Sequence, residues 1–312
     1  MDAPLTVGWI GTGRMGAPLS ERLARAGVPL AVWNRTPAKA EATVRAGAEL
    51  VDDPADLASR DVVFTMVTGS AQLETVTERL LSNPAHTPKI IVDCSTVSAE
   101  SSGRVRKAAA ERGAAFLAAP VSGNNRVAKS GLLSVVVSGP RAAFEQTEEL
   151  LAMLGRHVSY VGDGELARLA KICHNLLLGV VAQNLAEIVV LAEKAGIPRA
   201  SFLDFINNSA LGSMFTRYKT PALVKLDFTP TFTPVLLQKD FDLGLAAARE
   251  LQVPMPVSAA AREPVQSAVA QGRTDEDFAV LLELQAANSG LVLKPEDTPV
   301  DDGLGGAGPR QG

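Results

Sequence analysis

Few of the residues that build metal, disulfide or nucleic-acid sites occur in this chain. Among its 312 residues there are two cysteines and three histidines, and aromatic residues make up 4%. Two cysteines are too few for a disulfide framework or a CxxC site, and the three histidines do not have a metal-ligand spacing. Aromatic platforms for single-stranded nucleic acid are not expected either. We therefore predict no metal site.

The chain also has no large net charge of either sign. The formal net charge is −4 and charged residues make up 21% of the chain, which provides no basic footprint for nucleic acid. The first residues, MDAPLTVGWIG, contain no basic region followed by an apolar segment, so no signal peptide is predicted and a reduced, cytoplasmic setting is expected. With 46% hydrophobic residues, the composition is that of a soluble globular protein, and the length suffices for two domains with a substantial core.

A dinucleotide-binding pattern opens the chain. Leu5–Ile10 predicts a short strand, Met15–Ala26 has the apolar spacing of a helix, and Leu30–Trp33 predicts a second strand. The first strand and the helix are joined by a glycine-rich loop with the spacing GxGxxG, Gly11-Thr12-Gly13-Arg14-Met15-Gly16. The motif is informative because it lies between a strand and a helix within about thirty residues.

The glycines of this loop have separate physical tasks. Gly11 allows a tight turn, Gly13 lets the backbone approach a pyrophosphate, and Gly16 lets the helix and the strand pack closely. The phosphate then binds the free N–H groups at the start of the helix. The loop therefore predicts a bound dinucleotide, with all six of its residues as candidate cofactor ligands.

The end of the second strand indicates which dinucleotide is preferred. A site for NAD places an aspartate or a glutamate here to accept a hydrogen bond from the ribose 2′-hydroxyl. This chain has Asn34-Arg35-Thr36 instead. Arg35 can pair with a 2′-phosphate, and Asn34 and Thr36 can hydrogen-bond it. NADP(H) is therefore expected in preference to NAD(H); the alternative interpretation of Arg35 is a solvated arginine in a turn.

Strand and helix patterns continue to alternate along the first half of the chain. This alternation predicts a Rossmann-type, doubly wound and mostly parallel sheet with helices on both faces. Ligands bind beyond the carboxyl ends of the strands in such sheets, so the polar loops there are candidate sites. The further strands are predicted at Asp61–Val67, Lys89–Asp93, Ala114–Ala118, Leu133–Ser138 and Val158–Val161, and the helices at Gln72–Leu81, Ala99–Glu111 and Ala143–Leu154.

A long helix is predicted in the middle of the chain. About thirty residues without proline lie between Gly164 and the stop signal Gly196-Ile197-Pro198. Apolar residues surround this helix on nearly every side, as in a helix buried between other elements. Lys171 and Asn175 are four residues apart and share a face. We interpret the helix as the join between two domains with Lys171 directed at the ligand site, although such a lysine usually reaches solvent.

Beyond this helix the pattern is helical throughout. Helices are predicted at Arg199–Asn208, Leu236–Leu251, Val257–Gln271 and Asp275–Ala287, and no strand is expected. From residue 294 the composition, KPEDTPVDDGLGGAGPRQG, has no apolar face to bury. The expected division is a dinucleotide-binding domain over 1–164, an all-α substrate and dimerisation domain over 165–293, and a disordered tail over 294–312.

With these motifs in this order, the chain resembles the β-hydroxyacid dehydrogenase family, the 3-hydroxyisobutyrate dehydrogenase-like oxidoreductases, over roughly residues 5 to 290. The glycine-rich loop looks like the cofactor loop of that family. Four further segments are similar to family motifs: Asp93-Cys94-Ser95-Thr96, Ala119-Pro120-Val121-Ser122-Gly123, Lys171 with Asn175, and Lys239-Asp240.

The resemblance implies roles for individual residues. Lys171 would be the catalytic acid/base, Ser122, Gly123 and Asn175 would hold the substrate, and the cofactor would be contacted by Val67, Thr68, Thr96 and Lys239. The chain departs from the family pattern at Asn124, where a glycine is usual, at Ala118, where an acidic residue is usual, and at Asn125-Arg126-Val127. Asn124 narrows the expected substrate pocket and adds a donor and an acceptor to it, so it joins the substrate-binding candidates.

These expectations combine into an NADPH-dependent oxidoreductase. It would interconvert a small hydroxy acid, of the 3-hydroxyisobutyrate, 4-hydroxybutyrate or glycolate type, and its aldehyde or keto form. The Lys171 ammonium would stabilise the charge that hydride transfer places on the carbonyl oxygen and then deliver the proton. An apolar setting would lower the pKa of Lys171 toward neutrality.

Two alternatives stay open. A sister branch on the same fold reduces imines or plain ketones, and it typically carries another residue at the position of Lys171. A catalytically inactive NADP-binding regulatory protein is the second, and such relatives have lost the lysine. The long apolar helix exposes more surface than one small helical domain can cover, so a homodimer or a dimer-based homo-oligomer is also expected, with no membrane as partner.

Overall fold

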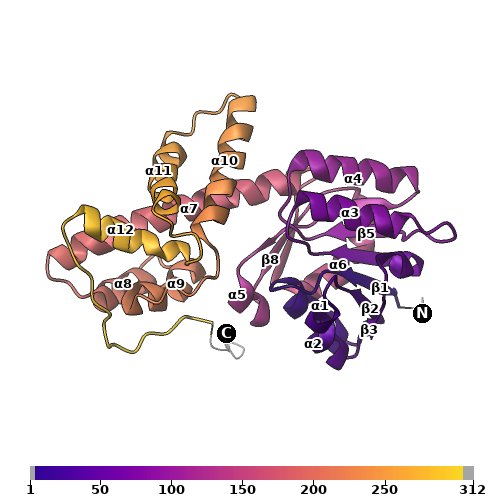
Figure 1. Cartoon of the computed structure of the whole chain (residues 1–312), viewed down its shortest axis with the longest axis horizontal. Helices are drawn as coiled ribbons and strands as arrows, with labels where there is room; N and C mark the ends of the chain where they lie inside the picture. Colours follow the sequence, from indigo (N-terminus) through magenta and orange to yellow (C-terminus); the bar gives the residue numbers. More distant parts are fainter. Residues whose placement is uncertain (1–3, 305–312) are drawn as a thin grey trace. The chain divides into compact units, whose positions relative to one another are not determined.

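The first strand, β1 (Val7–Ile10), lies inside a six-stranded parallel sheet of order β3-β2-β1-β4-β5-β6 (Figure 1). β1, β4 and β5 are buried along their whole length, because helices cover both faces and a parallel sheet of this kind needs continuous apolar runs. The other five strands are β2 (Leu30–Trp33), β3 (Glu49–Leu50), β4 (Val62–Thr65), β5 (Ile90–Asp93) and β6 (Ala115–Ala118).

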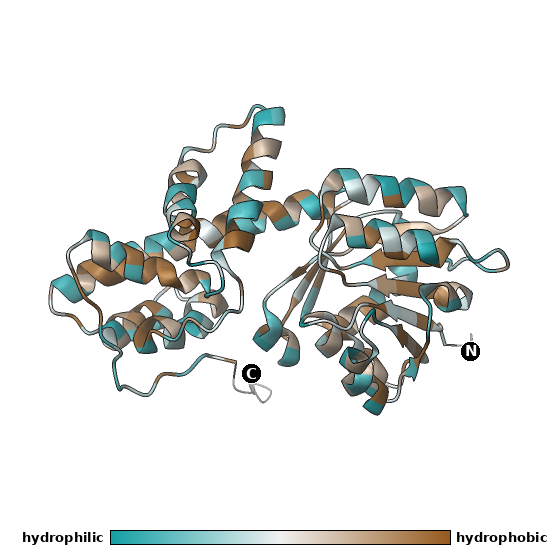
Figure 2. Ribbon diagram, in the orientation of Figure 1, coloured by the Kyte–Doolittle hydropathy of each residue, from teal (hydrophilic) through white to brown (hydrophobic). Residues whose placement is uncertain are grey.

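The strand order reverses between β1 and β4, which places the ligand crevice of a doubly wound sheet at the carboxyl ends of these two strands. Figure 2 shows the sheet strands as mainly hydrophobic and the helices around them as mixed. The Rossmann-type architecture predicted from the sequence is confirmed. The helices and 3₁₀ turns are α1 (Gly16–Arg25), η1 (Pro37–Ala40), α2 (Glu41–Arg45), η2 (Pro54–Ser59), α3 (Ser70–Leu81), α4 (Ala99–Glu111) and α6 (Arg141–Leu154).

The last strands of this unit form a second sheet, which the sequence patterns did not separate from the first. β7 (Val121–Ser122), β8 (Ser134–Val137) and β9 (His157–Tyr160) lie in that order, with β7 and β8 antiparallel and β8 and β9 parallel. Only two residues join β6 to β7, whereas a parallel crossover needs about a dozen, so the chain turns out of the main sheet after β6. The short helix α5 (Asn125–Lys129) fills the connection from β7 to β8.

The long helix predicted in the middle of the chain is α7 (Leu166–Lys194). The chain divides into two units at this helix, residues 1–171 and 172–312, and the computed structural model describes residues 4–304. Gly196 ends the helix with a φ of +89°, as the sequence predicted. By length and hydropathy α7 also passes the test for a membrane span, and half of its most apolar window is buried inside the protein.

The second unit is helical, and within residues 172–304 it contains no strand. Two glycines allow close packing: a Cβ on Gly179 of α7 would strike the Phe241 ring, and one on Gly244 would lie 2.6 Å from Leu176. The helices are α8 (Arg199–Asn208), α9 (Met214–Lys225), α10 (Pro234–Glu250), α11 (Pro256–Ala270), η3 (Phe278–Val280) and α12 (Leu281–Asn288). Sequence patterns missed α9, because Pro221 interrupts a segment of weak helix formers such as Thr216 and Tyr218.

After α12, the structure differs from the expected disordered tail over residues 294–304. This segment has no helix or strand, but the Glu296 carboxylate accepts hydrogen bonds from the backbone N–H groups of Arg199 (2.7 Å) and Ala200 (3.0 Å) at the start of α8. The Lys294 carbonyl accepts from the Arg199 guanidinium. Val300 also packs against the hydrophobic core of the helical unit, so polar anchors and one apolar contact hold a segment that has no apolar periodicity. The rest of the expected tail, residues 305–312, lies outside the described residues.

Candidate active site

The glycine-rich loop between β1 and α1 is fixed from below by a buried tryptophan. Gly11 has a φ of +98°, and a Cβ there would strike the Met66 carbonyl; a Cβ on Gly16 would strike the Gly11 carbonyl. The fully buried Trp9 indole N–H donates to that same Gly11 carbonyl at 2.9 Å and its rings stack on Phe64. Sequence reasoning did not single out Trp9, whose only signal is an indole in an otherwise aliphatic strand.

The space above the loop fits a phosphate group. A Cβ at Gly13 would meet nothing within 4 Å, so the backbone there is open to a ligand. The Thr12 hydroxyl oxygen is buried and lacks a hydrogen-bond partner among residues 4–304, which leaves it available to a phosphate oxygen at the start of α1. Arg14 and Met15 complete the loop before α1 begins at Gly16. These residues fit the pyrophosphate of a dinucleotide.

In the turn after β2, Asn34 makes hydrogen bonds within the protein, whereas Arg35 and Thr36 are exposed. The Asn34 side chain accepts from the Thr12 backbone N–H (2.9 Å) and donates to the Thr36 carbonyl (2.8 Å). Asn34 therefore shapes the turn and links it to the glycine-rich loop, rather than projecting its amide freely. Arg35 and Thr36 are exposed, and Arg35 pairs with no carboxylate in the described part of the chain. The role of Arg35 in binding a 2′-phosphate stays a prediction.

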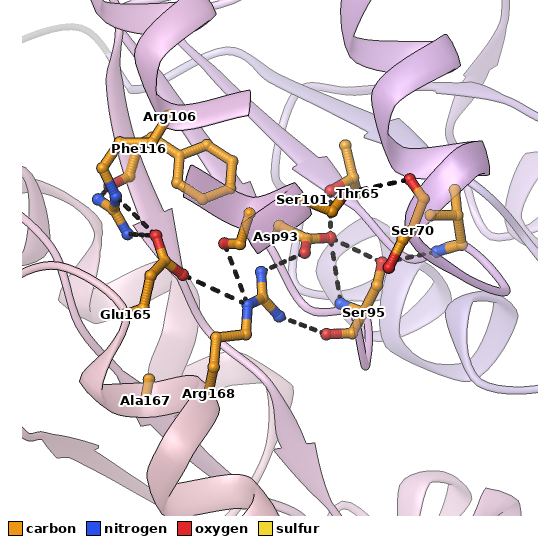
Figure 3. Close-up of polar contacts among 12 residues, drawn as sticks. Thr65, Ser70, Asp93, Ser95, Ser101, Arg106, Phe116, Glu165, Ala167 and Arg168 are labelled. Carbon is orange, nitrogen blue, oxygen red and sulfur yellow. Dashed lines mark hydrogen bonds and ion pairs between the residues drawn. The ribbon is translucent and has the colours of Figure 1, made fainter. Parts of the chain in front are cut away.

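The loops after β4 and β5 are joined through one buried carboxylate, that of Asp93 (Figure 3). One of its oxygens accepts from the Thr65 hydroxyl (2.6 Å) and from both the backbone N–H (3.1 Å) and the hydroxyl (2.6 Å) of Ser95. The Ser95 hydroxyl in turn accepts from the Val67 N–H at 2.8 Å. The predicted cofactor contacts Val67 and Thr68 after β4, and Thr96 after β5, lie on these two linked loops.

The other oxygen of Asp93 pairs with Arg168, in the first turn of α7 (Figure 3). Arg168 is 2% exposed, and its guanidinium also donates to the Ser95 carbonyl and to the Ser102 hydroxyl (3.2 Å). Sequence reasoning named the Asp93 motif but gave Arg168 no role. Its signal was a charge within an apolar helix, three residues before Lys171.

The cysteine of the Asp93 motif is not a nucleophile. Cys94 is fully buried, and burial, followed by the neighbouring Asp93 carboxylate, raises the pKa of its thiol far above the usual range. The groups of three or more histidine, cysteine, aspartate or glutamate side chains that a metal site needs are also absent from residues 4–304.

The predicted substrate loop follows β7. Gly123 has a φ of +131°, and a Cβ there would lie 2.5 Å from the Leu133 side chain, so only glycine fits. Asn124 is the N-cap of α5, and its side-chain oxygen accepts from the Val127 N–H at 3.1 Å. The acceptor that we expected Asn124 to add to the pocket is therefore used within the loop. Ser122 is the last residue of β7.

Lys171 lies in the second turn of α7 and is 9% exposed. It is the last residue of the first unit, the unit that carries every other predicted cofactor and substrate residue except Asn175 and Lys239. A lysine that is buried to this extent does not reach solvent in the way that the alternative interpretation of Lys171 requires. Its role as the catalytic acid/base stays a prediction.

Asn175 and Lys239 belong to the second unit and meet at Asp240. The Asn175 amide N–H donates to one Asp240 oxygen at 2.6 Å, and its amide oxygen lies 3.0 Å from the His174 ring. Lys239 lies 3.6 Å from the other Asp240 oxygen. Asp240 is 1% exposed and orients Asn175. The sequence indicated only the Lys239-Asp240 pair and did not assign this role to Asp240.

Two protein-family models together match most of the chain. Residues 6–162 match the NAD binding domain of 6-phosphogluconate dehydrogenase, and residues 165–285 match a domain described as NAD-binding of NADP-dependent 3-hydroxyisobutyrate dehydrogenase. Among characterised relatives, the chain is 30% identical to 2-(hydroxymethyl)glutarate dehydrogenase of Eubacterium barkeri, over 94% of this chain and 99% of the relative. It is 31% identical to glyoxylate/succinic semialdehyde reductase 1 of Arabidopsis thaliana, over 89% and 98%.

Among solved structures, the chain is similar to a 3-hydroxyisobutyrate dehydrogenase from Salmonella typhimurium. The TM-score is 0.81 at 26% identity, and the match covers 90% of this chain and 99% of the other. Imine reductases, such as that of Myxococcus stipitatus, share the fold at 22% identity with a TM-score of 0.58.

Proposed function

The chain belongs to the 3-hydroxyisobutyrate dehydrogenase-like β-hydroxyacid dehydrogenase family. On this premise we propose that it interconverts a small hydroxy acid and its aldehyde or keto form. In this proposal Lys171 is the acid/base and NADP(H) is the preferred cofactor. At the coarser level the chain is an NAD(P)-binding oxidoreductase of the hydroxyacid or semialdehyde dehydrogenase type. The observation that carries the finer proposal is the burial of Lys171, at 9% exposed, on the helix whose first turn is anchored to the loop after β5.

The proposed chemistry assigns each residue a task. A bound nicotinamide dinucleotide supplies or accepts the hydride. The Lys171 ammonium stabilises negative charge on the substrate oxygen as the carbonyl is reduced and then gives that oxygen a proton; in the reverse direction the neutral amine removes the proton from the hydroxyl. Burial strengthens the interaction between the ammonium and the oxygen, because little water screens it.

The substrate loop suits an acid. The Gly123 backbone can approach a ligand closely because the residue has no Cβ, and with Ser122 it offers donors for a carboxylate. The two characterised relatives are named for substrates that are acids, 2-(hydroxymethyl)glutarate in one and glyoxylate or succinic semialdehyde in the other. We therefore expect a substrate with a carboxylate within a few bonds of the reacting carbon.

The preference for NADP(H) rests on the turn after β2. The turn lacks a carboxylate that would repel a 2′-phosphate, and it presents the exposed guanidinium of Arg35. The description of the family model for residues 165–285, an NADP-dependent enzyme, agrees with this choice.

The test measures the rate at which the purified protein oxidises NADPH and NADH with short keto acids and semialdehyde acids as substrates. Plain ketones and cyclic imines are assayed separately as the substrates of the alternative functions. The proposal expects turnover of acids with NADPH. Lys171→Ala should lower kcat by about a hundredfold or more, while Lys107→Ala, an exposed lysine on α4, should keep wild-type kcat. Equal turnover by Lys171→Ala and wild type would remove the assigned role. A preference for imines, or cofactor binding without any turnover, would favour the alternative functions.

We also propose a homodimer. Large apolar side chains are exposed on the helical unit, including Leu177 (63%) and Leu191 (71%) on α7 and Phe205 (67%) on α8. Exposed apolar surface of this kind is typical of protein interfaces. Size-exclusion chromatography with light scattering should give twice the chain mass, and a monomer at micromolar concentration would refute the proposal.

A further inference from the structure

We propose that Arg168 is a positioning residue for Lys171: by binding the Asp93 carboxylate and the Ser95 carbonyl, it sets the rotation of α7 and with it the place of the Lys171 ammonium. This inference rests on the proposed function, in which Lys171 is the acid/base. It assigns a task to a buried charge that the mechanism itself does not use.

A buried guanidinium needs an explanation, because removing it from water costs several kcal/mol. Arg168 is 2% exposed, and Asp93, its partner, is fully buried. The side chain nevertheless meets acceptors on three different segments, namely the end of β5, the loop after it, and Ser102 on α4. A planar guanidinium with several partners has one permitted orientation. The helix that carries it is thereby held in one rotation.

The partners of Arg168 are themselves immobilised (Figure 3). Asp93 is held by the hydroxyls of Thr65 and Ser95, and Ser95 by the N–H of Val67. One continuous network of hydrogen bonds thus joins the loops after β4 and β5, which carry the predicted cofactor contacts, to the first turn of α7. Every one of these residues belongs to the unit that ends at Lys171.

Arg168 and Lys171 are three residues apart on α7, so their side chains lie on the same side of the helix. A rotation of α7 by about 10° would move an ammonium some 8 Å from the helix axis by about 1.5 Å. A displacement of about 1 Å at a catalytic group can lower the rate by about a hundredfold. The position of Lys171 is therefore sensitive to the contact that Arg168 makes.

The start of α7 has further anchors, of which only the Glu165 carboxylate also lies near the Arg168 guanidinium, at 3.8 Å. The Ser138 hydroxyl donates to the Gly164 carbonyl (2.7 Å) and accepts from the Ala167 N–H (3.0 Å). Arg106 binds Glu165 (2.8 Å) and the Gly164 carbonyl (2.7 Å), and packs over Phe116. These contacts keep the helix start in place when Arg168 is changed, so the expected consequence of the change is a local rotation.

The test substitutes Arg168→Lys, which keeps the charge and removes the branched guanidinium. Arg199→Lys is the matched control, because Arg199 is also a buried arginine (1% exposed) that binds a carboxylate and several carbonyls, but in the helical unit. Both variants should lose thermal stability. The two are compared by kcat, by KM, by cofactor Kd from protein fluorescence, and by the kinetic isotope effect with reduced cofactor deuterated at the transferred position.

A readout that needs no turnover reports on Lys171 directly. Lysines are labelled by reductive ¹³C-methylation, and the Lys171 resonance is assigned by its absence in Lys171→Arg. In Arg168→Lys we expect kcat to fall roughly 10- to 100-fold with cofactor Kd within about twofold, a larger isotope effect, and a shifted Lys171 resonance. In Arg199→Lys we expect kcat, the isotope effect and the Lys171 resonance to stay as in wild type.

Wild-type kcat together with an unchanged Lys171 resonance in Arg168→Lys would overturn the inference. If this variant fails to fold, the double variant Asp93→Asn with Arg168→Gln removes both charges and keeps a hydrogen bond. We expect the double variant to fold with a lower kcat and a shifted Lys171 resonance. Wild-type values of kcat and of the resonance in the double variant would again overturn the inference. Failure of the proposed function looks different: Lys171→Ala then keeps its turnover, while the resonance still shows whether Arg168 positions Lys171.

Discussion

At the scale of single residues, the proposed preference for NADP(H) rests on Arg35. Its guanidinium is exposed and pairs with no carboxylate in residues 4–304, whereas the neighbouring Asn34 is committed to the turn itself. A charge that is already solvated and unpaired can bind a 2′-phosphate without first losing a partner.

Replacing Arg35 should therefore change the choice of cofactor and little else. Arg35→Asp should raise KM for NADPH by about tenfold or more, because it places a repulsive carboxylate at the phosphate and offers an acceptor to a ribose hydroxyl. KM for NADH should fall or stay constant. Steady-state kinetics with both cofactors measures this, with Lys39→Leu, an exposed lysine in η1, as the control. An unchanged ratio of the two KM values would show that Arg35 does not contact the cofactor.

At the scale of elements, the short helix α5 depends on its cap. Five residues form one turn that cannot persist alone, and Asn124 satisfies the Val127 N–H at its start. Asn124→Ala should destabilise α5 by about 1 kcal/mol and raise KM for the substrate with a smaller change in kcat. Asn124→Ser retains a capping hydroxyl and should behave as wild type. Equal KM values for the two variants would instead point to a direct contact between the Asn124 side chain and the substrate.

The start of α8 is stabilised by Glu296, nearly a hundred residues further along the chain. The carboxylate accepts from two N–H groups of the first turn, where the helix dipole also favours a negative charge. Glu296→Ala should lower the free energy of unfolding by about 1 to 2 kcal/mol in urea titrations. Glu250→Ala, at an exposed site in the last turn of α10, serves as control and should change it by less than about 0.5 kcal/mol.

At the scale of the whole molecule, stability in acid depends on Asp61 at the amino-terminal edge of the sheet. Lys89, at 2.9 Å, and hydrogen bonds from the N–H and hydroxyl of Thr6 lower the pKa of Asp61 from 3.8 to about 2. The folded state therefore binds this proton more weakly than the unfolded state. The stabilisation is complete above about pH 4 and is lost as the pH falls through 2.

Asp61→Asn should accordingly lower the free energy of unfolding at neutral pH by on the order of 1 kcal/mol, since the site is partly exposed. The difference from wild type should shrink between pH 4 and pH 2. Chemical denaturation at several pH values measures it, with Asp52→Asn at an exposed site as control. A difference that stays constant down to pH 2 would mean that ionisation of Asp61 does not contribute.

The sequence by itself determined the features that short segments encode. The GxGxxG loop, the alternation of strands and helices, and the end of α7 at Gly196 were all predicted, because steric limits on glycine and the periods of apolar residues act within a few turns of chain. The family and the fold were recognised on the same local motifs and are confirmed. The roles of Lys171 and the other site residues stay predictions.

Only the tertiary structure decided which distant polar groups meet. Arg168 and Asp93 are 75 residues apart, Asn175 and Asp240 are 65 apart, and Glu296 and Arg199 are 97 apart. The spacing of apolar residues along the sequence does not predict such pairs. A buried charge is stable only beside its partner, and the fold brings that partner into place. The second sheet was decided in the same way, since the two residues between β6 and β7 are too few for a parallel crossover and β8 then pairs outside the main sheet.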